Sequence, residues 1–153
     1  MTLSSSSFLS LDRSLWVPRP LSSVFPFFAD AKNLEQLTPD WLRFQILSPL
    51  LIEMRVGALI DYRIRLYKIP MRWRTLISAW EPPYRFVDEQ IRGPYSLWWH
   101  EHTFVEQDGG TLLEDHVRYR APLGFIAHPL MVNRQLQRIF DYRTEVIRRL
   151  FGS

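Results

Sequence analysis

Between residues 58 and 120 the chain contains five consecutive segments with the sequence pattern of β-strands. In the first, Ala58–Tyr67, apolar residues at every second position alternate with Asp61, Arg63 and Arg65. A period of two places successive side chains on opposite faces, so this strand has one apolar face. The other four are predicted at Met71–Ala79, Arg85–Arg92, Ser96–Glu106 and Thr111–Arg120. Proline or glycine marks each of the later turns, which indicates an antiparallel meander on short connections.

Shorter elements precede the meander and a helix follows it. A further strand fits Phe8–Val17, with no indication of which face points inward. We then expect a short helix with Ser22 as its N-cap, a helical turn at Leu34–Leu37 and an extended segment at Phe44–Leu47. After Pro122, apolar residues recur at the spacing of an amphipathic helix, at Val132, Leu136, Ile139 or Phe140, Ile147 and Leu150.

A twisted sheet with one apolar face must be covered by another layer. The terminal helix is the one predicted element long enough to cover it, so the expected fold is α+β, with a sheet that grips a helix. A chain of 153 residues suits one core, and we expect a single domain over residues 1–153.

Composition excludes several classes of protein and site. The chain has no cysteine, which excludes disulfides, a thiolate nucleophile and cysteine-based metal sites. Hydrophobic residues make up 46% of it, which excludes a disordered chain, and a net charge of +3 does not require nucleic acid or an anionic membrane as a partner. We find no signal-like charged region and no apolar run of about 18 residues, so we expect a soluble, cytoplasmic protein.

The last predicted hairpin indicates which side chains face inward. Every second residue of its second strand is charged or polar: Glu114, His116, Arg118 and Arg120. Four such side chains are not accommodated in a core, so the residues between them face inward: Asp115, Val117 and Tyr119.

The turn of this hairpin sets the pairing of its two strands. A two-residue turn at Gly109-Gly110 places Phe104 opposite Asp115, His102 opposite Val117 and His100 opposite Tyr119. The inward set of the first strand is then Trp98, His100, His102 and Phe104. A three-residue turn would shift the register by one residue and reverse the facing.

At the preceding turn, Gly93-Pro94, we favour the pairing that places Asp88 across from His100. Phe86 and Gln90 then share the inward face with Asp88. An unpaired buried polar group costs about 1–3 kcal/mol, so these groups either pair with one another or face a wet or ligand-filled space. So many polar groups in an apolar interior favour a cavity.

Four groups of motifs occur along the chain: Val24–Asp30 with Asn33-Leu34 and Leu37–Pro39, Gly93–Tyr95 with Trp98 or Trp99, His100–His102, and Asp115–Tyr119 with Pro122–Gly124. Together they resemble bacterial ligand-binding proteins of the START/Bet v 1-like superfamily, the SRPBCC or polyketide cyclase/dehydrase-like group. The resemblance implies a helix-grip fold, in which a seven-stranded antiparallel sheet curves around a long C-terminal helix, with two short helices between strands one and two. It also implies a hydrophobic cavity for a small, largely apolar ligand such as a lipid, sterol or polyketide.

We predict that the ligand is bound by one set of residues in this cavity: Tyr62, Trp73, Phe86, Asp88, Gln90, Trp98, His100, His102, Phe104, Tyr119 and Leu136. The favoured function is binding or transfer. The alternative is a cyclase or dehydratase in which His100 is a general base oriented by Asp88, and Tyr119 or His102 donates to a developing enolate.

The predictions about other sites and partners rest on fewer residues. His100 and His102 with Asp88 or Asp115 have the residue types of a zinc or non-haem iron site, but no third histidine shares their face and we predict no metal. The chain has no G-x-G-x-x-G fingerprint, and we predict no cofactor. Trp73 alternates with its neighbouring arginines, so they form no stacking platform for nucleic acid. Phe125 and Ile126 near the predicted cavity mouth suit transient contact with a membrane or a partner enzyme, and the oligomeric state stays open.

Overall fold

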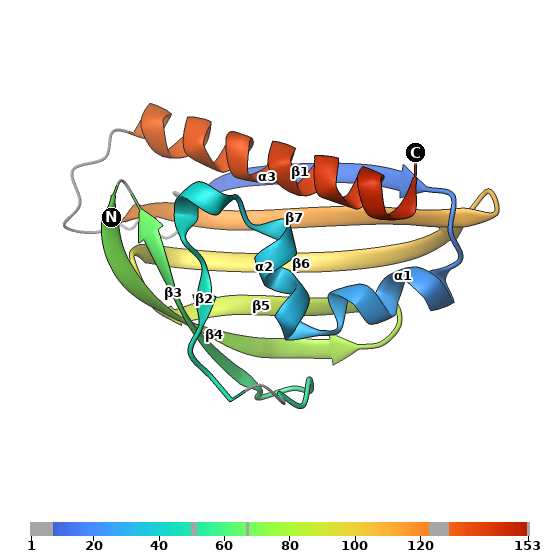
Figure 1. Ribbon diagram of the computed structural model, residues 1–153, viewed down its shortest axis with the longest axis horizontal. Helices are drawn as coiled ribbons and strands as arrows, with labels where there is room; N and C mark the ends of the chain where they lie inside the picture. Colours follow the sequence, from blue (N-terminus) through green and yellow to red (C-terminus); the bar gives the residue numbers. More distant parts are fainter. Residues whose placement is uncertain (1–7, 50–51, 67, 123–128, 153) are drawn as a thin grey trace, which may run out of the picture.

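The computed structural model describes residues 8–49, 52–66, 68–122 and 129–152. In these ranges the chain forms a seven-stranded antiparallel sheet in the order β1-β7-β6-β5-β4-β3-β2, a long C-terminal helix, and short helices between β1 and β2 (Figure 1). This is the helix-grip architecture that the sequence predicts. The single domain stays a prediction, and Phe125 and Ile126 lie outside the described residues.

The elements lie close to their predicted ranges. The strands are β1 (Leu9–Val17), β2 (Gln45–Ile46), β3 (Leu59–Leu66), β4 (Ile69–Glu81), β5 (Arg85–Arg92), β6 (Tyr95–Gln107) and β7 (Gly110–Pro122). The helices are α1 (Leu21–Phe28), α2 (Leu34–Leu37) and α3 (Pro129–Phe151), with 3-10 turns η2 (Ala31–Asn33) and η3 (Asp40–Leu42).

Two details of the helices differ from the prediction. Ser22 is not an N-cap, because α1 begins at Leu21 and Pro20 occupies the N-cap position. Leu150 lies on the outer side of α3 and is 43% exposed, so it does not belong to the apolar face of that helix.

The β6–β7 turn consists of Asp108 and Gly109 rather than of Gly109 and Gly110. Both residues have positive φ, 50° and 77°, as the favoured two-residue hairpin turn requires. The predicted pairings are therefore wrong by two residues: His102 lies opposite Asp115, and His100 lies opposite Val117. The predicted facing is confirmed, because a shift of two residues returns every side chain to the same face.

The structure also shows the strand pairing of Asp88 in β5 and the direction in which a β1 side chain points. Asp88 pairs with His100 across β5 and β6, as predicted. In β1, whose facing the sequence left open, Arg13 points toward α3: its Nη2 donates to Gln137 Oε1 at 2.6 Å, and its Nη1 lies 2.9 Å from Asp141.

Two hydrophobic clusters fill much of the space between sheet and helices. The first joins α1 to the sheet and to the C-terminal half of α3, and its buried members are Val17, Leu21, Val24, Phe25, Phe28, Leu37, Phe86, Phe104, Leu113, Val146 and Ile147. The second joins the N-terminal half of α3 to the sheet, with Leu11, Ile64, Trp73, Tyr95, Trp98, Val117, Tyr119, Val132, Leu136 and Phe140.

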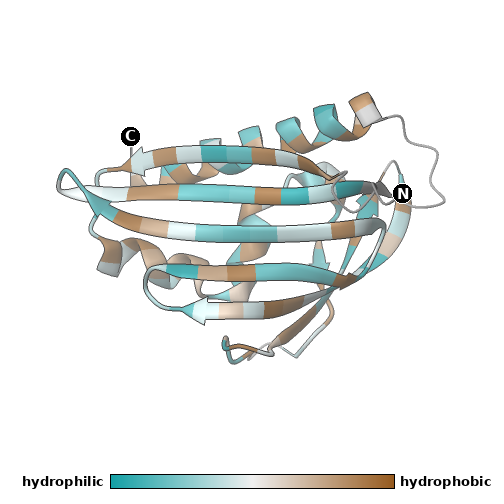
Figure 2. Ribbon diagram, turned by 180° about the vertical axis from the view of Figure 1, so that it is seen from behind, coloured by the Kyte–Doolittle hydropathy of each residue, from teal (hydrophilic) through white to brown (hydrophobic). Residues whose placement is uncertain are grey.

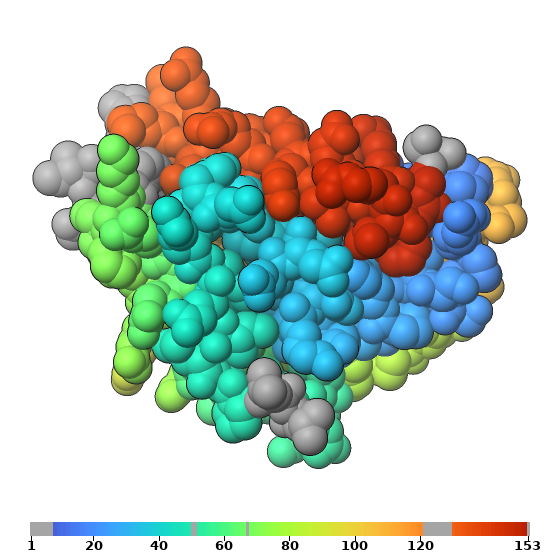
Figure 3. All heavy atoms as spheres, viewed as in Figure 1, coloured from blue at the N-terminus to red at the C-terminus, as the bar shows by residue number. Residues whose placement is uncertain are grey.

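The two faces of the sheet differ in their cover. From behind, hydrophilic and hydrophobic residues alternate along the strands of the uncovered face (Figure 2). On the other side, α1, the segment through α2 and η3, and α3 lie next to one another over the sheet (Figure 3), and α2 contacts α3. Where η3 meets α3, the guanidinium of Arg138 lies 4.9 Å from the ring centroid of Trp41. Among the described residues, no helix is long and apolar enough to cross a membrane.

Candidate functional site

A cavity of about 170 Å³ lies between the sheet and its helical cover. Its sheet side is formed by inward residues of β3, β4, β5 and β6, and its opposite side by residues of α1, α2, η3 and α3. β7 contributes none of the described lining residues, since its inward side chains are packed beneath α3. The cavity is therefore displaced toward the β3 side of the sheet.

Eight of the eleven residues predicted to bind a ligand line this cavity: Tyr62, Trp73, Phe86, Asp88, Trp98, His100, His102 and Leu136. Their aromatic members contact one another. The rings of Tyr62 and Trp73 are stacked with centroids 5.7 Å apart, and Trp98 meets Trp73 edge to face at 5.4 Å. Their role in binding stays a prediction.

The other three residues predicted to bind a ligand do not line the cavity. Gln90 closes the β5–β6 turn: its Nε2 donates to the Tyr95 carbonyl at 2.7 Å, and its Oε1 accepts from the Tyr95 amide at 3.0 Å. Phe104 is enclosed by Phe25 and Phe28, with ring centroids 5.1 and 5.4 Å away. Tyr119 is fully buried beneath α3, where Asn133 donates to its hydroxyl at 3.3 Å. These three belong to the turn and the packed interior rather than to the cavity wall.

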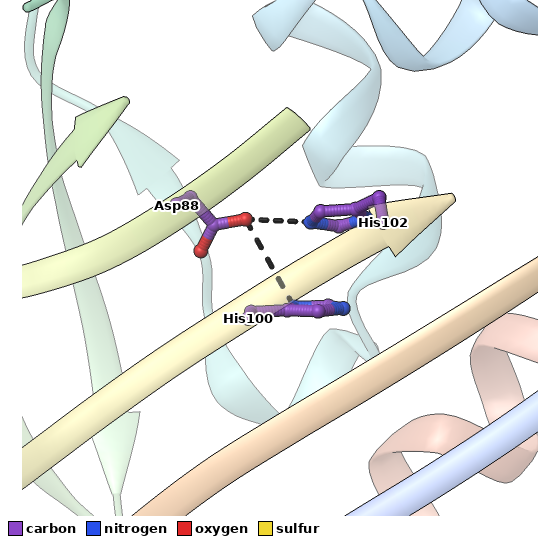
Figure 4. A group of neighbouring side chains, drawn as sticks. All are labelled: Asp88, His100 and His102. Atoms are coloured by element: carbon purple, nitrogen blue, oxygen red, sulfur yellow. Dashed lines mark hydrogen bonds and ion pairs between the residues drawn. The ribbon is translucent and has the colours of Figure 1, made fainter. Parts of the chain in front are cut away.

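A network of two carboxylates, two imidazoles and one guanidinium lies along β5 and β6, where Asp88, His100, His102 and Arg143 line the cavity. His102 Nε2 lies 2.6 Å from Asp88 Oδ2, and His100 Nε2 lies 2.8 Å from Asp115 Oδ1. The two imidazole rings are stacked, with centroids 3.7 Å apart (Figure 4). Arg143 Nη2 donates to Asp115 Oδ1 at 3.3 Å and lies 3.5 Å from His102 Nδ1.

The hydrogen bonds in this network run diagonally between strands. Asp88 lies directly across from His100, yet it bonds His102, and its Oδ2 is 3.9 Å from His100 Nδ1. Strand side chains lean along the strand direction, so a diagonal neighbour can be closer than the direct partner. The carboxylate that orients His100 is consequently Asp115 rather than Asp88, the partner predicted from pairing.

Burial and charge shift the pKa values of the network in opposite directions. Burial, together with the positive charge of a protonated His100, lowers the pKa of His102 to about 4, although the hydrogen bond to Asp88 opposes this shift. Burial alone would raise the pKa of Asp88 and Asp115. For Asp88 the charge of His100 and the bond from His102 outweigh burial, and for Asp115 the charge of Arg143 and the bond from His100 do, so both pKa values are lowered. Both carboxyls are ionised at neutral pH.

Arg143 is a charged residue of the cavity wall that the sequence analysis missed. It is 8% exposed and lines the cavity, and its buried Nε has no hydrogen-bond partner within the described part of the chain. The signal was present in the sequence, because Leu136, Phe140, residue 143 and Ile147 follow one another at helical spacings of three and four. A charged residue on an apolar helix face requires a buried counter-charge, and inward-facing Asp115 provides it.

Asp88, His100 and His102 each offer one atom that could ligate a metal ion, and these atoms lie within 4.8 Å of one another. Their geometry is that of a hydrogen-bonded network. The nearly parallel imidazole rings, inclined by 23°, do not converge on a common point, and His102 Nε2 is engaged by Asp88. The guanidinium of Arg143 also lies where it would oppose a second cation.

Comparison with known proteins gives the context of this site. A family model described as polyketide cyclase/dehydrase and lipid transport matches residues 17–145. No curated protein sequence matches the chain.

Solved structures are similar over almost the whole chain. The Zhui aromatase/cyclase from Streptomyces sp. R1128 has a TM-score of 0.72 at 14% identity, covering 94% of this chain and 96% of that one. A START superfamily protein from Mycobacterium smegmatis has a TM-score of 0.68 at 11% identity, with 93% and 96% covered. Ginseng major latex-like protein 151 from Panax ginseng has a TM-score of 0.58 at 9% identity, with 90% and 96% covered. At these identities the similarity establishes the fold.

Proposed function

The chain belongs to the polyketide cyclase/dehydrase and lipid transport family of the START/Bet v 1-like superfamily, and from this premise we propose that it binds a small, largely apolar molecule in its cavity, as a binding or transfer protein. The observation that carries the proposal is the cavity of about 170 Å³, walled mostly by aromatic and aliphatic side chains and bordered along β5 and β6 by the polar network. Small-molecule sites commonly combine an apolar wall with a few convergent polar groups.

The size of the cavity limits what apolar contact alone can contribute. A ligand that buries about 200 Å² of apolar surface gains about 5 kcal/mol at 25 cal/mol per Å², before the cost of association. That gain alone corresponds to weak binding, so the polar network is expected to contribute affinity as well as orientation.

Titration with the neutral fluorescent probe N-phenyl-1-naphthylamine tests this proposal. We expect one saturable site per chain, and displacement of the probe by added lipophiles. Trp98→Ala should weaken binding about tenfold, because Trp98 lines the cavity. Trp99→Ala is the matched control: this neighbouring side chain lies on the opposite face, beneath the guanidinium of Arg118 at 5.6 Å, and its loss should leave the affinity unchanged. Binding that never saturates, or equal effects of the two variants, would contradict the proposal.

One observation favours a second candidate, a cyclase or dehydratase. His100 lines the cavity, its Nε2 is held by Asp115, and within the described residues its Nδ1 makes no hydrogen bond. An imidazole held by a carboxylate on one nitrogen and open on the other is suited to general base catalysis. In this candidate mechanism Asp115 orients the imidazole of His100, and Asp88 lies on the side of His100 that faces the substrate.

Conversion of a linear poly-β-ketone precursor, followed by mass spectrometry, tests this candidate. Enzymatic turnover should be lost in His100→Gln while N-phenyl-1-naphthylamine still binds, which separates chemistry from binding. Conversion at the same rate by wild type and His100→Gln would exclude a cyclase or dehydratase that uses His100 as its base. Transient contact with a membrane or a partner enzyme and the cytoplasmic location stay predictions.

A further inference from the structure

We propose that the ligand carries one protonated amine, which binds between the carboxylate of Asp88 and the aromatic faces of Tyr62, Trp73 and Trp98. This inference rests on the proposed binding function and adds the chemical class of the ligand. Three features of the cavity carry it: an incompletely paired carboxylate, the distribution of charge in the network, and the aromatic wall.

Asp88 places a carboxylate on the sheet side of the cavity wall, with 20% of its side chain exposed. Its Oδ2 is bonded by His102 at 2.6 Å, whereas its Oδ1 makes no hydrogen bond with any residue in the described ranges. The Asp88 side chain is largely withdrawn from water, so Oδ1 loses part of the hydrogen bonds that it would make in bulk solvent. A ligand with a donor group restores them.

The charges of the network do not provide Asp88 with a hydrogen-bonded cation. Two carboxylates face one guanidinium and the charge of His100, and Arg143 is bonded to Asp115 at 3.3 Å rather than to Asp88. His102, which bonds Asp88, has its pKa lowered by burial to about 4 and is a neutral donor at pH 7. His100 Nδ1 lies 3.9 Å from Asp88, beyond hydrogen-bond distance. An ammonium group beside Asp88 would pair the carboxylate directly.

Three aromatic side chains share the wall of the cavity with Asp88. Tyr62, Trp73 and Trp98 line the same cavity as Asp88 and contact one another at centroid distances of 5.7 and 5.4 Å. Burial raises the pKa of Tyr62, and the charge of Asp88 adds to this effect, so the phenol lies within the field of the carboxylate. Ring faces attract cations, most strongly where water is excluded. A hydroxyl would satisfy the Asp88 oxygen but would gain nothing from these faces.

Three probes that share an indole ring separate the ligand classes: tryptamine is cationic, tryptophol is neutral and indole-3-acetate is anionic. Their affinities are measured at pH 7 by displacement of N-phenyl-1-naphthylamine. We expect tryptamine to bind at least tenfold more tightly than tryptophol, and indole-3-acetate to bind most weakly. Asp88→Asn should reduce the affinity for tryptamine to that for tryptophol, and should change tryptophol binding less than twofold.

Glu89→Gln is the matched control for charge. Glu89 is the next residue of β5 and lies on the opposite face, across from Trp99, so this variant removes one negative charge without altering the cavity. It should preserve the preference for tryptamine. The ranking of the probes on the wild-type protein needs no variant, so the test does not depend on the folding of Asp88→Asn.

Tryptophol binding as tightly as tryptamine would overturn this inference, as would failure of tryptamine to displace the bound probe. Tightest binding of indole-3-acetate would also overturn it and would assign recognition to Arg143. In these cases saturable binding of N-phenyl-1-naphthylamine leaves the proposed function intact. If that probe does not bind at all, both the proposed function and this inference fail.

Discussion

Under α1 the concave face of the sheet is filled with side chains, whereas under α2 and η3 the same face borders a cavity. The strand β6 runs through both regions. Its Phe104 is packed among the rings of Phe25 and Phe28, while Trp98, six residues earlier on the same face, lines the cavity. One regular strand therefore supplies a filled interior at one end and a binding wall at the other.

The covering helices account for this difference. α1 has eight residues and carries Phe25 and Phe28, both of which reach the sheet. α2 has only four residues, and its Leu34 and Leu37 line the cavity instead of filling it. The position of the hollow is thus decided by the cover and not by the sheet. Stability and binding should accordingly respond to substitutions in different regions.

The largest expected effect is on the stability of the filled region. Phe104→Ala should lower the free energy of unfolding by about 4 kcal/mol, because it removes a fully enclosed ring and leaves a new void. Chemical denaturation measures this loss. Affinity for N-phenyl-1-naphthylamine should be unchanged, in contrast to Trp98→Ala. If Phe104→Ala weakens probe binding as much as Trp98→Ala does, the two regions are not separate.

Arg143 lies at the boundary of the two regions, and its loss should have the next largest effect. Arg143→Met leaves the carboxylate of Asp115 buried without its guanidinium, and should cost about 3 kcal/mol in the free energy of unfolding. Arg138→Met, on the same helix, removes a contact with Trp41 at the surface and should cost about 0.5 kcal/mol. Equal losses in the two variants would mean that the buried pair does not support the fold.

A smaller effect concerns pH and the polar side of the cavity. The pKa of His102 is about 4 in the folded chain and 6.5 in an unfolded one, so between these values the unfolded state binds more protons. The free energy of unfolding should therefore fall as the pH is lowered from 6.5 to 4, by about 2 kcal/mol from this residue. Asp88 and Asp115, with lowered pKa values, add a further loss only below about pH 3.8.

Denaturation of wild type and His102→Asn across this pH range measures the contribution. The variant should lose less stability on acidification than the wild type. Parallel curves for the two proteins would show that His102 is not the group responsible.

Much of the sheet could be predicted from the sequence, because a period of two and short turns leave few alternatives. The pairing of Asp88 with His100 follows from that logic. The β6–β7 turn was misplaced because Asp108, Gly109 and Gly110 all tolerate turn conformations, and the alternation on either side does not distinguish a shift of two residues.

The site was less predictable than the sheet for three physical reasons. Which carboxylate bonds which imidazole depends on how the side chains lean, and not on the strand pairing. Whether an inward aromatic ring is enclosed, as Phe104 is, or lines a cavity, as Trp98 does, depends on the helix above it. The side chain of Gln90 hydrogen-bonds the backbone of the β5–β6 turn, and its position on the inward face of β5 does not predict this contact. Arg143 could have been found by asking what a charged residue does on an apolar helix face.

The continuity of β6 limits how this protein can acquire a different ligand. Insertion of two residues in β6 before His102 would keep the alternation intact, yet it would carry His102 to the position of Phe104 and Phe104 toward the end of the strand. We therefore expect new specificities to arise by substitution on β3, β4 and α2, at positions such as Ile64, Thr75 and Leu34, which line the cavity without serving the filled region. We therefore expect the sequence of β6 to change least, among the strands of the binding wall, as the ligand changes during evolution.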